Sequence, residues 1–294
     1  GTEACLLFNT GYMANVGIIS SLFSRHDIIF SDRFNHASIV DGILLSGAKL
    51  KRYQHRDMND LERMLKESEE GKQKCIVTDS IFSMDGDIAP LDKIVELAKK
   101  YHCLVMVDEA HALGVMGKRG KGLVEHFSLE KEIDVQMGTL SKAVGSFGAY
   151  CCGSQKLISF LVNKARSFIY TTAMPPSTAA ASHKAIEIIE EDARRRETLW
   201  KHTTFIEKRL RNLGFNILDS QTPIIPIVIG DSAKALEFSR ELFDQGIFIS
   251  AIRPPTVPKG SERLRLTIMA THTQSDIEYL LQSIEKIGKK LKVI

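Results

Sequence analysis

The chain has 294 residues, of which 44% are hydrophobic and 26% are charged, and its formal net charge is +3. This composition is typical of a globular protein, and the length is sufficient for two domains with cores of their own. The net charge is too small to indicate a nucleic-acid partner, and no apolar stretch reaches the roughly 20 residues that cross a bilayer. We therefore expect neither a nucleic acid nor a membrane as partner.

The cysteines argue for a reducing, cytoplasmic location. Their number, 5, is odd, and most of them lie inside apolar runs, which does not fit a disulfide framework. No cysteine or histidine spacing matches a zinc site, so we expect no metal. The chain begins at Gly1 without an initiator methionine, and we expect an N-terminal segment to be missing from it.

Strand-like and helical patterns alternate through the first two thirds of the chain. In chain order, they predict strand 27–31, helix 38–46, strand 50–53, helix 58–69, strand 75–78, a helix around 91–98, and strands 104–107, 135–137 and 149–152. Such alternation predicts an α/β fold with a mostly parallel sheet that is flanked by helices.

The pattern changes after Pro175 and Pro176, which indicates a smaller α+β domain. A long helix is predicted for 177–210, with a possible break near Asp192. It is followed by strand 224–229, helix 233–245, and strands 247–251 and 264–269. Ser275 and Glu278 are expected to form a capping box at the start of the last helix. We place the domain boundary near residue 180, which gives a large domain 1–180 and a small domain 181–294.

Two polar stretches follow predicted buried strands, Val107-Asp108-Glu109-Ala110-His111 and Gly138-Thr139-Leu140-Ser141-Lys142. Strand ends are where α/β proteins build their sites. An amine, a carboxylate and an imidazole collected there suit pyridoxal phosphate (PLP), with a Schiff base on Lys142 and Asp108 against the pyridinium nitrogen. The hydroxyls of Thr139 and Ser141 could hold its phosphate, and His111 could hydrogen-bond its phenolic oxygen. Lys142 could also be an exposed loop lysine, and Asp108 a helix cap or salt-bridge partner.

Further candidates lie elsewhere in the chain. His36, in a loop before a helix, could stack on the cofactor ring, or it could simply flank that helix. Gly11 and Tyr12 lie where a loop feeds a helix, and backbone amides at such a position bind phosphate. Ser83 could contact the ring or belong to an ordinary turn. Arg253 lies in a proline-stiffened segment, where its planar guanidinium suits a substrate carboxylate, although it could equally be a surface arginine.

Taken together, the chain resembles the α-oxoamine synthases, PLP-dependent enzymes of fold type I. The stretches that carry the resemblance span nearly the whole chain: Gly11-Tyr12, Asn35-His36-Ala37-Ser38, Phe82-Ser83-Met84-Asp85-Gly86-Asp87, Val107 to His111, Gly138 to Lys142, Tyr170-Thr171-Thr172-Ala173-Met174-Pro175-Pro176, and Arg253-Pro254-Pro255-Thr256-Val257-Pro258. The resemblance implies PLP as cofactor and a homodimer with a shared active site.

The resemblance also implies a role for each residue. Lys142 would be the Schiff-base lysine, Asp108 the partner of the ring nitrogen, and His36 the residue stacked on the ring. His111 and Ser83 would contact the oxygen side of the ring, and the phosphate would be bound by Gly11, Tyr12, Thr139 and Ser141. Thr171 and Thr172 would reach the phosphate of a neighbouring subunit. Arg253 and Thr256 would bind the substrate.

The implied activity is the decarboxylative condensation of an amino acid, expected to be L-alanine, with an acyl-CoA, expected to be pimeloyl-CoA. The product would be an amino ketone of biotin biosynthesis. The alternatives are a relative that joins glycine to acetyl-CoA, an aminotransferase of the same fold type, and a non-catalytic partner subunit. The sequence departs from the family pattern in two ways. The family has an N-terminal segment upstream of Gly1 that we expect to be missing here, and Phe147 and Tyr150 lie where many relatives carry more glycine.

Overall fold

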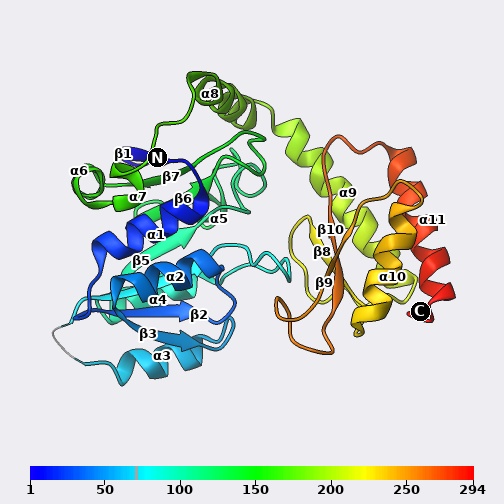
Figure 1. Ribbon diagram of the computed structural model, residues 1–294, viewed down its shortest axis with the longest axis horizontal. Coiled ribbons are helices and arrows are strands. Elements are labelled where there is room, and N and C mark those ends of the chain that lie inside the picture. Colours follow the sequence, from blue (N-terminus) through cyan, green and yellow to red (C-terminus); the bar gives the residue numbers. More distant parts are fainter. Residues whose placement is uncertain (70–71) are drawn as a thin grey trace. The chain divides into compact units, whose positions relative to one another are not determined.

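The computed structural model describes residues 1–69 and 72–294 (Figure 1). By its internal contacts the chain divides into two compact units. The first unit comprises Gly1–Phe82 and Ala89–Ala193, and the second comprises Ser83–Ile88 and Arg194–Ile294. The assignment of residues 1–180 and 181–294 to a large and a small domain stays a prediction.

The first unit is built on a sheet that has seven strands in the described part of the chain, in the order β1-β7-β6-β5-β4-β2-β3. From β3 to β6 all neighbours are parallel, whereas β7 is antiparallel to both β6 and β1. This topology confirms the predicted α/β fold with a mostly parallel sheet. The strands are β1 (Ala4–Phe8), β2 (Ile28–Asp32), β3 (Lys49–Tyr53), β4 (Lys74–Asp79), β5 (Leu104–Asp108), β6 (Val135–Thr139) and β7 (Ala149–Gly153).

Helices cover both faces of this sheet. Strand residues alternate between the faces, so Cys75 and Val77 of β4 join the core beneath α1, α2 and α6, while Ile76 lies on the side of α3 and α4. Figure 1 shows α1 beside α2, and the two helices pack directly on each other. The helices are α1 (Gly11–Leu22), α2 (Ala37–Ser46), α3 (Met58–Lys66), α4 (Leu91–Lys100), α5 (Leu123–His126), α6 (Gln155–Lys164), α7 (Arg166–Ile169) and α8 (Pro176–Glu191).

The second unit contains a three-stranded antiparallel sheet in the order β8-β10-β9, with α10 packed against β9, β10 and α11. The short segment Ser83–Ile88 belongs to this unit and is tied to it by the Arg263 guanidinium, which donates to Asp85 Oδ1 at 2.5 Å. Its elements are α9 (Ala193–Asn212), β8 (Ile224–Val228), α10 (Ser232–Phe243), β9 (Ser250–Ile252), β10 (Arg263–Thr267) and α11 (Gln274–Lys290).

The predicted elements are present, with differences at several ends. The predicted break near Asp192 is confirmed, because α8 ends there and α9 begins at the next residue. The predicted capping box was wrong: Thr273 caps α11, and Asp276, not Glu278, accepts its backbone N–H at 2.8 Å. The helix starts one residue before Ser275, so that serine lies in the first turn. Strand β1 was not predicted, and β9 lies later than the predicted strand 247–251.

Across residues 1–69 and 72–294 no helix combines the length and the apolar character that a membrane span requires.

Candidate active site

Four neighbouring strands of the first unit end in polar residues. Asp32, Asp79, Asp108 and Thr139 are the last residues of β2, β4, β5 and β6. These strands run parallel, so their carboxyl ends lie along one edge of the sheet, and Asp79 is directly opposite Asp108. This edge is where open α/β sheets bind ligands.

Asp108 is a buried carboxylate held by neutral donors. Its side chain is only 4% exposed, and its Oδ2 accepts a hydrogen bond of 2.8 Å from the side-chain amide of Asn15. The backbone N–H of Ala110 donates to Oδ1, also at 2.8 Å. These bonds fix the position of the carboxylate, and a buried carboxylate is stabilised when a cation pairs with it. A protonated ring nitrogen would supply that cation.

Asp79 was not among the predicted residues, although it ends an apolar strand just as Asp108 does. It is 7% exposed, and burial, reinforced by the neighbouring Asp108, raises its pKa well above the usual value. The backbone N–H of His36, which donates to Asp79 Oδ2 at 2.7 Å, and the Lys142 amine oppose this rise in pKa. Asp79 therefore interacts with both Asp108 and Lys142, which brings the predicted amine and carboxylate to the same edge of the sheet.

His36 caps helix α2, so its interpretation as a helix flank is correct for the local structure. Its Nδ1 accepts the backbone N–H of Ser38 at 3.2 Å and lies 2.7 Å from the hydroxyl of the same serine. Ser38 Oγ also accepts a hydrogen bond from the Asn15 amide that donates to Asp108. One chain of hydrogen bonds thus links the imidazole to the buried carboxylate, and stacking on a ring stays a proposal.

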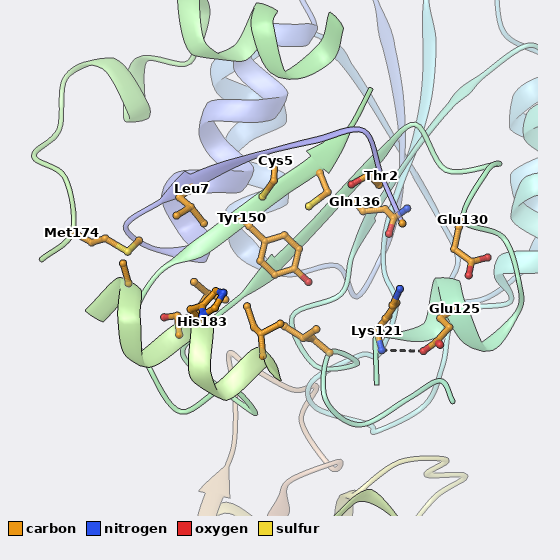
Figure 2. A pocket seen from close by; sticks show the side chains of 17 residues that line it. Thr2, Cys5, Leu7, Lys121, Glu125, Glu130, Gln136, Tyr150, Met174 and His183 are labelled. Carbon is orange, nitrogen blue, oxygen red and sulfur yellow. Dashed lines mark hydrogen bonds between the residues drawn. The ribbon is translucent and has the colours of Figure 1, made fainter. Parts of the chain in front are cut away.

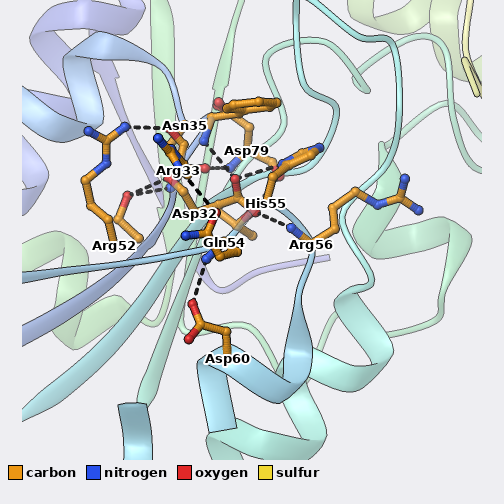
Figure 3. A network of polar contacts seen from close by, with 12 residues as sticks. Asp32, Arg33, Asn35, Arg52, Gln54, His55, Arg56, Asp60 and Asp79 are labelled. Carbon is orange, nitrogen blue, oxygen red and sulfur yellow. Dashed lines mark hydrogen bonds and ion pairs between the residues drawn. The ribbon is translucent and has the colours of Figure 1, made fainter. Parts of the chain in front are cut away.

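A polar network holds the loop that carries His36 (Figure 3). Asp32 is almost fully buried and accepts hydrogen bonds from His55 Nδ1 and the backbone N–H of Arg56, both at 2.9 Å. Asn35 Oδ1 accepts the backbone N–H of Asp79 at 2.9 Å. Because the loop is tied to both β3 and β4, the position of His36 is well defined.

The start of helix α1 lies beside Thr139. A Cβ on Gly11 would be 3.5 Å from the side chain of Met137 and 4.0 Å from Thr139 Oγ1. Thr139 Oγ1 is in turn 2.8 Å from Ser141 Oγ. Backbone amides at a helix start and two hydroxyls form a suitable site for phosphate. Three of the four predicted phosphate ligands are therefore close together.

Tyr12, the fourth predicted phosphate ligand, follows Gly11 in the first turn of α1. Its hydroxyl donates to Asp41 Oδ2 at 2.6 Å, and this hydrogen bond raises the pKa of the tyrosine. Asp41 belongs to α2, so the bond joins the two helices that start at this edge of the sheet.

His111 lies in the turn that follows Asp108, and Glu109 of the same turn binds the start of helix α5. Glu109 is 2% exposed, and its carboxylate accepts the backbone N–H groups of Leu123 at 3.0 Å and Val124 at 2.7 Å. Burial raises the pKa of Glu109 to about 7, although these hydrogen bonds lower it. Farther along the turn, a Cβ on Gly114 would lie 2.8 Å from Ala143, so the turn packs beside the loop that carries Lys142.

Thr171 and Thr172 lie at the surface of the first unit. The side-chain amide of Asn9 donates to Thr171 Oγ1 at 3.1 Å and to the backbone oxygen of Thr172 at 2.7 Å. Asn9 lies between β1 and α1, so this surface stretch is attached next to the start of α1. Its role toward a neighbouring subunit stays a prediction.

The remaining predicted residues belong to the second unit. The backbone oxygen of Ser83 accepts from Arg265 Nε at 2.6 Å. Arg253 and Thr256 are exposed, and the Thr256 N–H donates to the Arg253 oxygen at 3.1 Å. Their roles at the ring and at the substrate stay predictions.

Tyr150, noted above as a departure from the family, has a structural explanation. Its phenol ring occupies the space beside Gly138, where any Cβ would collide with it. The aromatic side chain and the glycine thus complement each other. Phe147 instead has 47% of its surface exposed, so it does not fill the interior of the first unit.

The residues of this edge match the chemical groups of PLP. A helix start with two hydroxyls suits the phosphate, a buried carboxylate suits the protonated ring nitrogen, and an amine suits the aldehyde. Together with the mostly parallel seven-stranded sheet, they define the class of PLP-dependent enzymes of fold type I.

Comparisons with known proteins agree with this class. The family model for aminotransferase class I and II matches residues 1–284. The 8-amino-7-oxononanoate synthase of Citrifermentans bemidjiense is 52% identical over 296 residues, which is 100% of this chain and 76% of the relative. "8-amino-7-oxononanoate synthase 2" of Bacillus subtilis is 50% identical and is covered to 75%.

Solved structures give the same result. An 8-amino-7-oxononanoate synthase from Francisella tularensis superimposes with a TM-score of 0.86 at 33% identity, over 100% of this chain and 84% of the other. A serine palmitoyltransferase from S. paucimobilis with bound PLP and myriocin has a TM-score of 0.97 at 33% identity, over 100% and 74%. The chain belongs to the aminotransferase class I and II family, in its α-oxoamine synthase branch. The resemblance inferred from the sequence is thereby confirmed.

Proposed function

We propose that the chain catalyses the decarboxylative condensation of L-alanine with pimeloyl-CoA to 8-amino-7-oxononanoate, CoA and carbon dioxide, a step of biotin biosynthesis. The observation that carries the proposal is the placement of two strand ends: buried Asp108 ends β5, and the loop with Lys142 follows the neighbouring parallel strand β6. An amine and a buried carboxylate are thereby presented at one sheet edge. Relatives that bear this activity in their names are about half identical to the chain over its full length, which supports the choice of substrates.

The proposed cofactor is PLP, which supplies an electron sink for the pair of electrons left on the α-carbon of the amino acid. Lys142 would hold the cofactor covalently, and its amine would serve as general base for the α-proton of the amino acid. Asp108 keeps a proton on the ring nitrogen. Within the proposed site, the other roles are stacking by His36, contacts of His111 and Ser83 to the oxygen side of the ring, and binding of the phosphate by Gly11, Tyr12, Thr139 and Ser141.

Asp79 supports this division of roles. Two carboxylates side by side at one sheet edge repel each other, and the raised pKa of Asp79 favours its protonated form. A proton on Asp79 leaves a single negative charge for the ring nitrogen. The same side chain accepts the backbone N–H of His36, so it also orients the residue proposed to stack on the ring.

We further propose that Arg253 and Thr256 bind the substrate, with the Arg253 guanidinium on the carboxylate of the amino acid. Residues 1–180 would then bind the cofactor, and residues 181–294 would form the small domain that carries both substrate-binding residues. The exposed position of both side chains in the second unit leaves them accessible to a ligand.

A homodimer with a shared active site is also proposed, with Thr171 and Thr172 reaching the phosphate of the partner. Large exposed apolar side chains flank them, Tyr170 at 71% and Ile169 at 42% exposure, as expected for an interface. A cytoplasmic location is supported by the free thiols of all 5 cysteines.

The test is an assay of a panel of acyl-CoA substrates with alanine, glycine and serine, in which release of CoA and of carbon dioxide is measured. We expect alanine with pimeloyl-CoA to be preferred. Preference for glycine and acetyl-CoA would instead identify a 2-amino-3-ketobutyrate CoA ligase. PLP binding without CoA release would point to an aminotransferase or a non-catalytic partner subunit.

The role of Lys142 has its own test. A general base contributes roughly 10²- to 10⁴-fold, and loss of the covalent link adds to this, so Lys142→Ala should abolish turnover with the fold intact. The exposed Lys131→Ala is the matched control and should retain activity. Borohydride reduction of the PLP-loaded protein should leave a phosphopyridoxyl group on Lys142. Near-normal turnover by Lys142→Ala would show that the lysine is assigned wrongly.

A further inference from the structure

Two cysteines face each other across the edge of the large sheet. Cys5 of β1 is directly opposite Cys152 of β7 in an antiparallel pair. Opposite residues in such a pair have Cα atoms about 4.5 or 5.5 Å apart, depending on their place in the ladder. Both values lie within the range of roughly 4.4–6.8 Å that a disulfide spans. Both thiols are free, so the register alone brings together two cysteines that can be bridged.

Both side chains also line one cavity of about 450 Å³. Figure 2 shows Cys5 on its wall together with Leu7, Tyr150 and Gln136. Cys151, the neighbour of Cys152, points to the opposite face and is fully buried in the core. The cavity therefore gives a small reagent access to Cys5 and Cys152, whereas Cys151 is shielded.

The two opposed thiols influence each other's pKa. The contact with Cys5, the side chain of Thr2 and the amine of Gly1 lower the pKa of Cys152 to about 7, although burial opposes this shift. The same contact raises the pKa of Cys5. Of the two, Cys152 is thus the one that more readily forms a thiolate, and Cys5 is the one that stays a thiol. An attacking thiolate beside a resolving thiol is the arrangement needed for disulfide exchange.

We propose that Cys5 and Cys152 form a redox-active dithiol, which small disulfides convert into a cross-strand disulfide. The Cys152 thiolate attacks one sulfur of the reagent, whose S–S bond breaks and releases one thiolate. Cys5 then loses its proton and attacks Cys152 of the mixed disulfide, which releases the second thiol. Two protein thiols are oxidised, and one reagent disulfide is reduced to two thiols.

The disulfide would join two neighbouring strands that lead to the proposed phosphate site and to the Lys142 loop. β1 leads through Asn9 and Thr10 into helix α1, and β7 follows the loop that carries Lys142. The proposal depends on strand register, a shared cavity and the thiol pair. It therefore does not depend on whether the chain binds PLP.

The test uses the full chain, fully reduced, with bis(2-hydroxyethyl) disulfide as the probe. We expect the protein to lose two thiols, a peptide map to show Cys5 linked to Cys152, and dithiothreitol to restore both thiols. The variant Cys152→Ala should form no such link. Cys5→Ala should stop at a mixed disulfide on Cys152, and the control Cys103→Ala should behave like the parent protein.

The rate of the first step tests the thiolate. The contact with Cys5 is the largest cause that lowers the pKa of Cys152. Cys5→Ala should therefore raise that pKa, leave less thiolate at pH 7, and slow the first step relative to the parent protein. Retention of all thiols in excess probe, a mixed disulfide that never resolves in the parent protein, or a link through another cysteine would overturn the proposal.

Discussion

Glu109 should make the stability of the protein depend on pH. Its pKa in the folded state is about 7, against a reference value of 4.5, because burial disfavours the charged form. A raised folded pKa means that the contribution of Glu109 to stability is complete below pH 4.5 and is lost as the pH rises through 7. The difference of about 2.5 pH units corresponds to about 3 kcal/mol of unfolding free energy.

Urea unfolding at a series of pH values between 4 and 8 measures this loss. Asp79 also has a raised pKa and adds pH dependence of the same sign, so the comparison must be between variants. Glu109→Gln cannot titrate, and its unfolding free energy should fall by about 3 kcal/mol less than that of the parent over this range. The control is Glu130→Gln, which replaces a half-buried glutamate of the first unit. Its unfolding free energy should depend on pH as that of the parent protein does. Parallel curves for Glu109→Gln and the parent would refute this reasoning.

Further predictions concern the same edge of the sheet. Gly122 has φ 126°, and a Cβ there would lie 2.7 Å from the carboxylate carbon of Glu109, so Gly122→Ala should lower the free energy of unfolding in urea by about 3 kcal/mol. Asp79→Asn keeps an acceptor for the His36 amide and should retain more kcat than Asp79→Ala, which steady-state kinetics would show. Asp108→Asn removes the charge proposed to hold the ring proton, so kcat/KM should fall by about 10²-fold or more; an unchanged kcat/KM would contradict this role.

Much of the fold could be predicted from the sequence because its signals are local. Alternating helical and strand patterns predicted the mostly parallel sheet, and the break at Asp192 was visible as an interruption of a long helix. Strand direction at the sheet edge was not predicted, because an alternating pattern does not say which way a neighbour runs. The capping box failed for a similar reason: both Thr273 and Ser275 can cap, and only the start of the helix decides between them.

The candidate site shows the same limit. Lys142 and Asp108 stand out because polar residues directly follow buried strands. Asp79 carries the same signal and could have been found with it. Asn15 carries no such signal, because its contact with Asp108 depends on the packing of α1 over the sheet rather than on any spacing in the sequence.

The sequence by itself determined the class of fold and the family and indicated the residues proposed to bear the chemistry, since each of these depends on short patterns and on residue types. The tertiary structure alone decided which titratable groups lie opposite each other. The pairing of Asp79 with Asp108 arises from the register between β4 and β5, and that of Cys5 with Cys152 from the register between β1 and β7. Register joins residues far apart in the chain, and burial then sets their pKa values, so neither can be read from a local pattern.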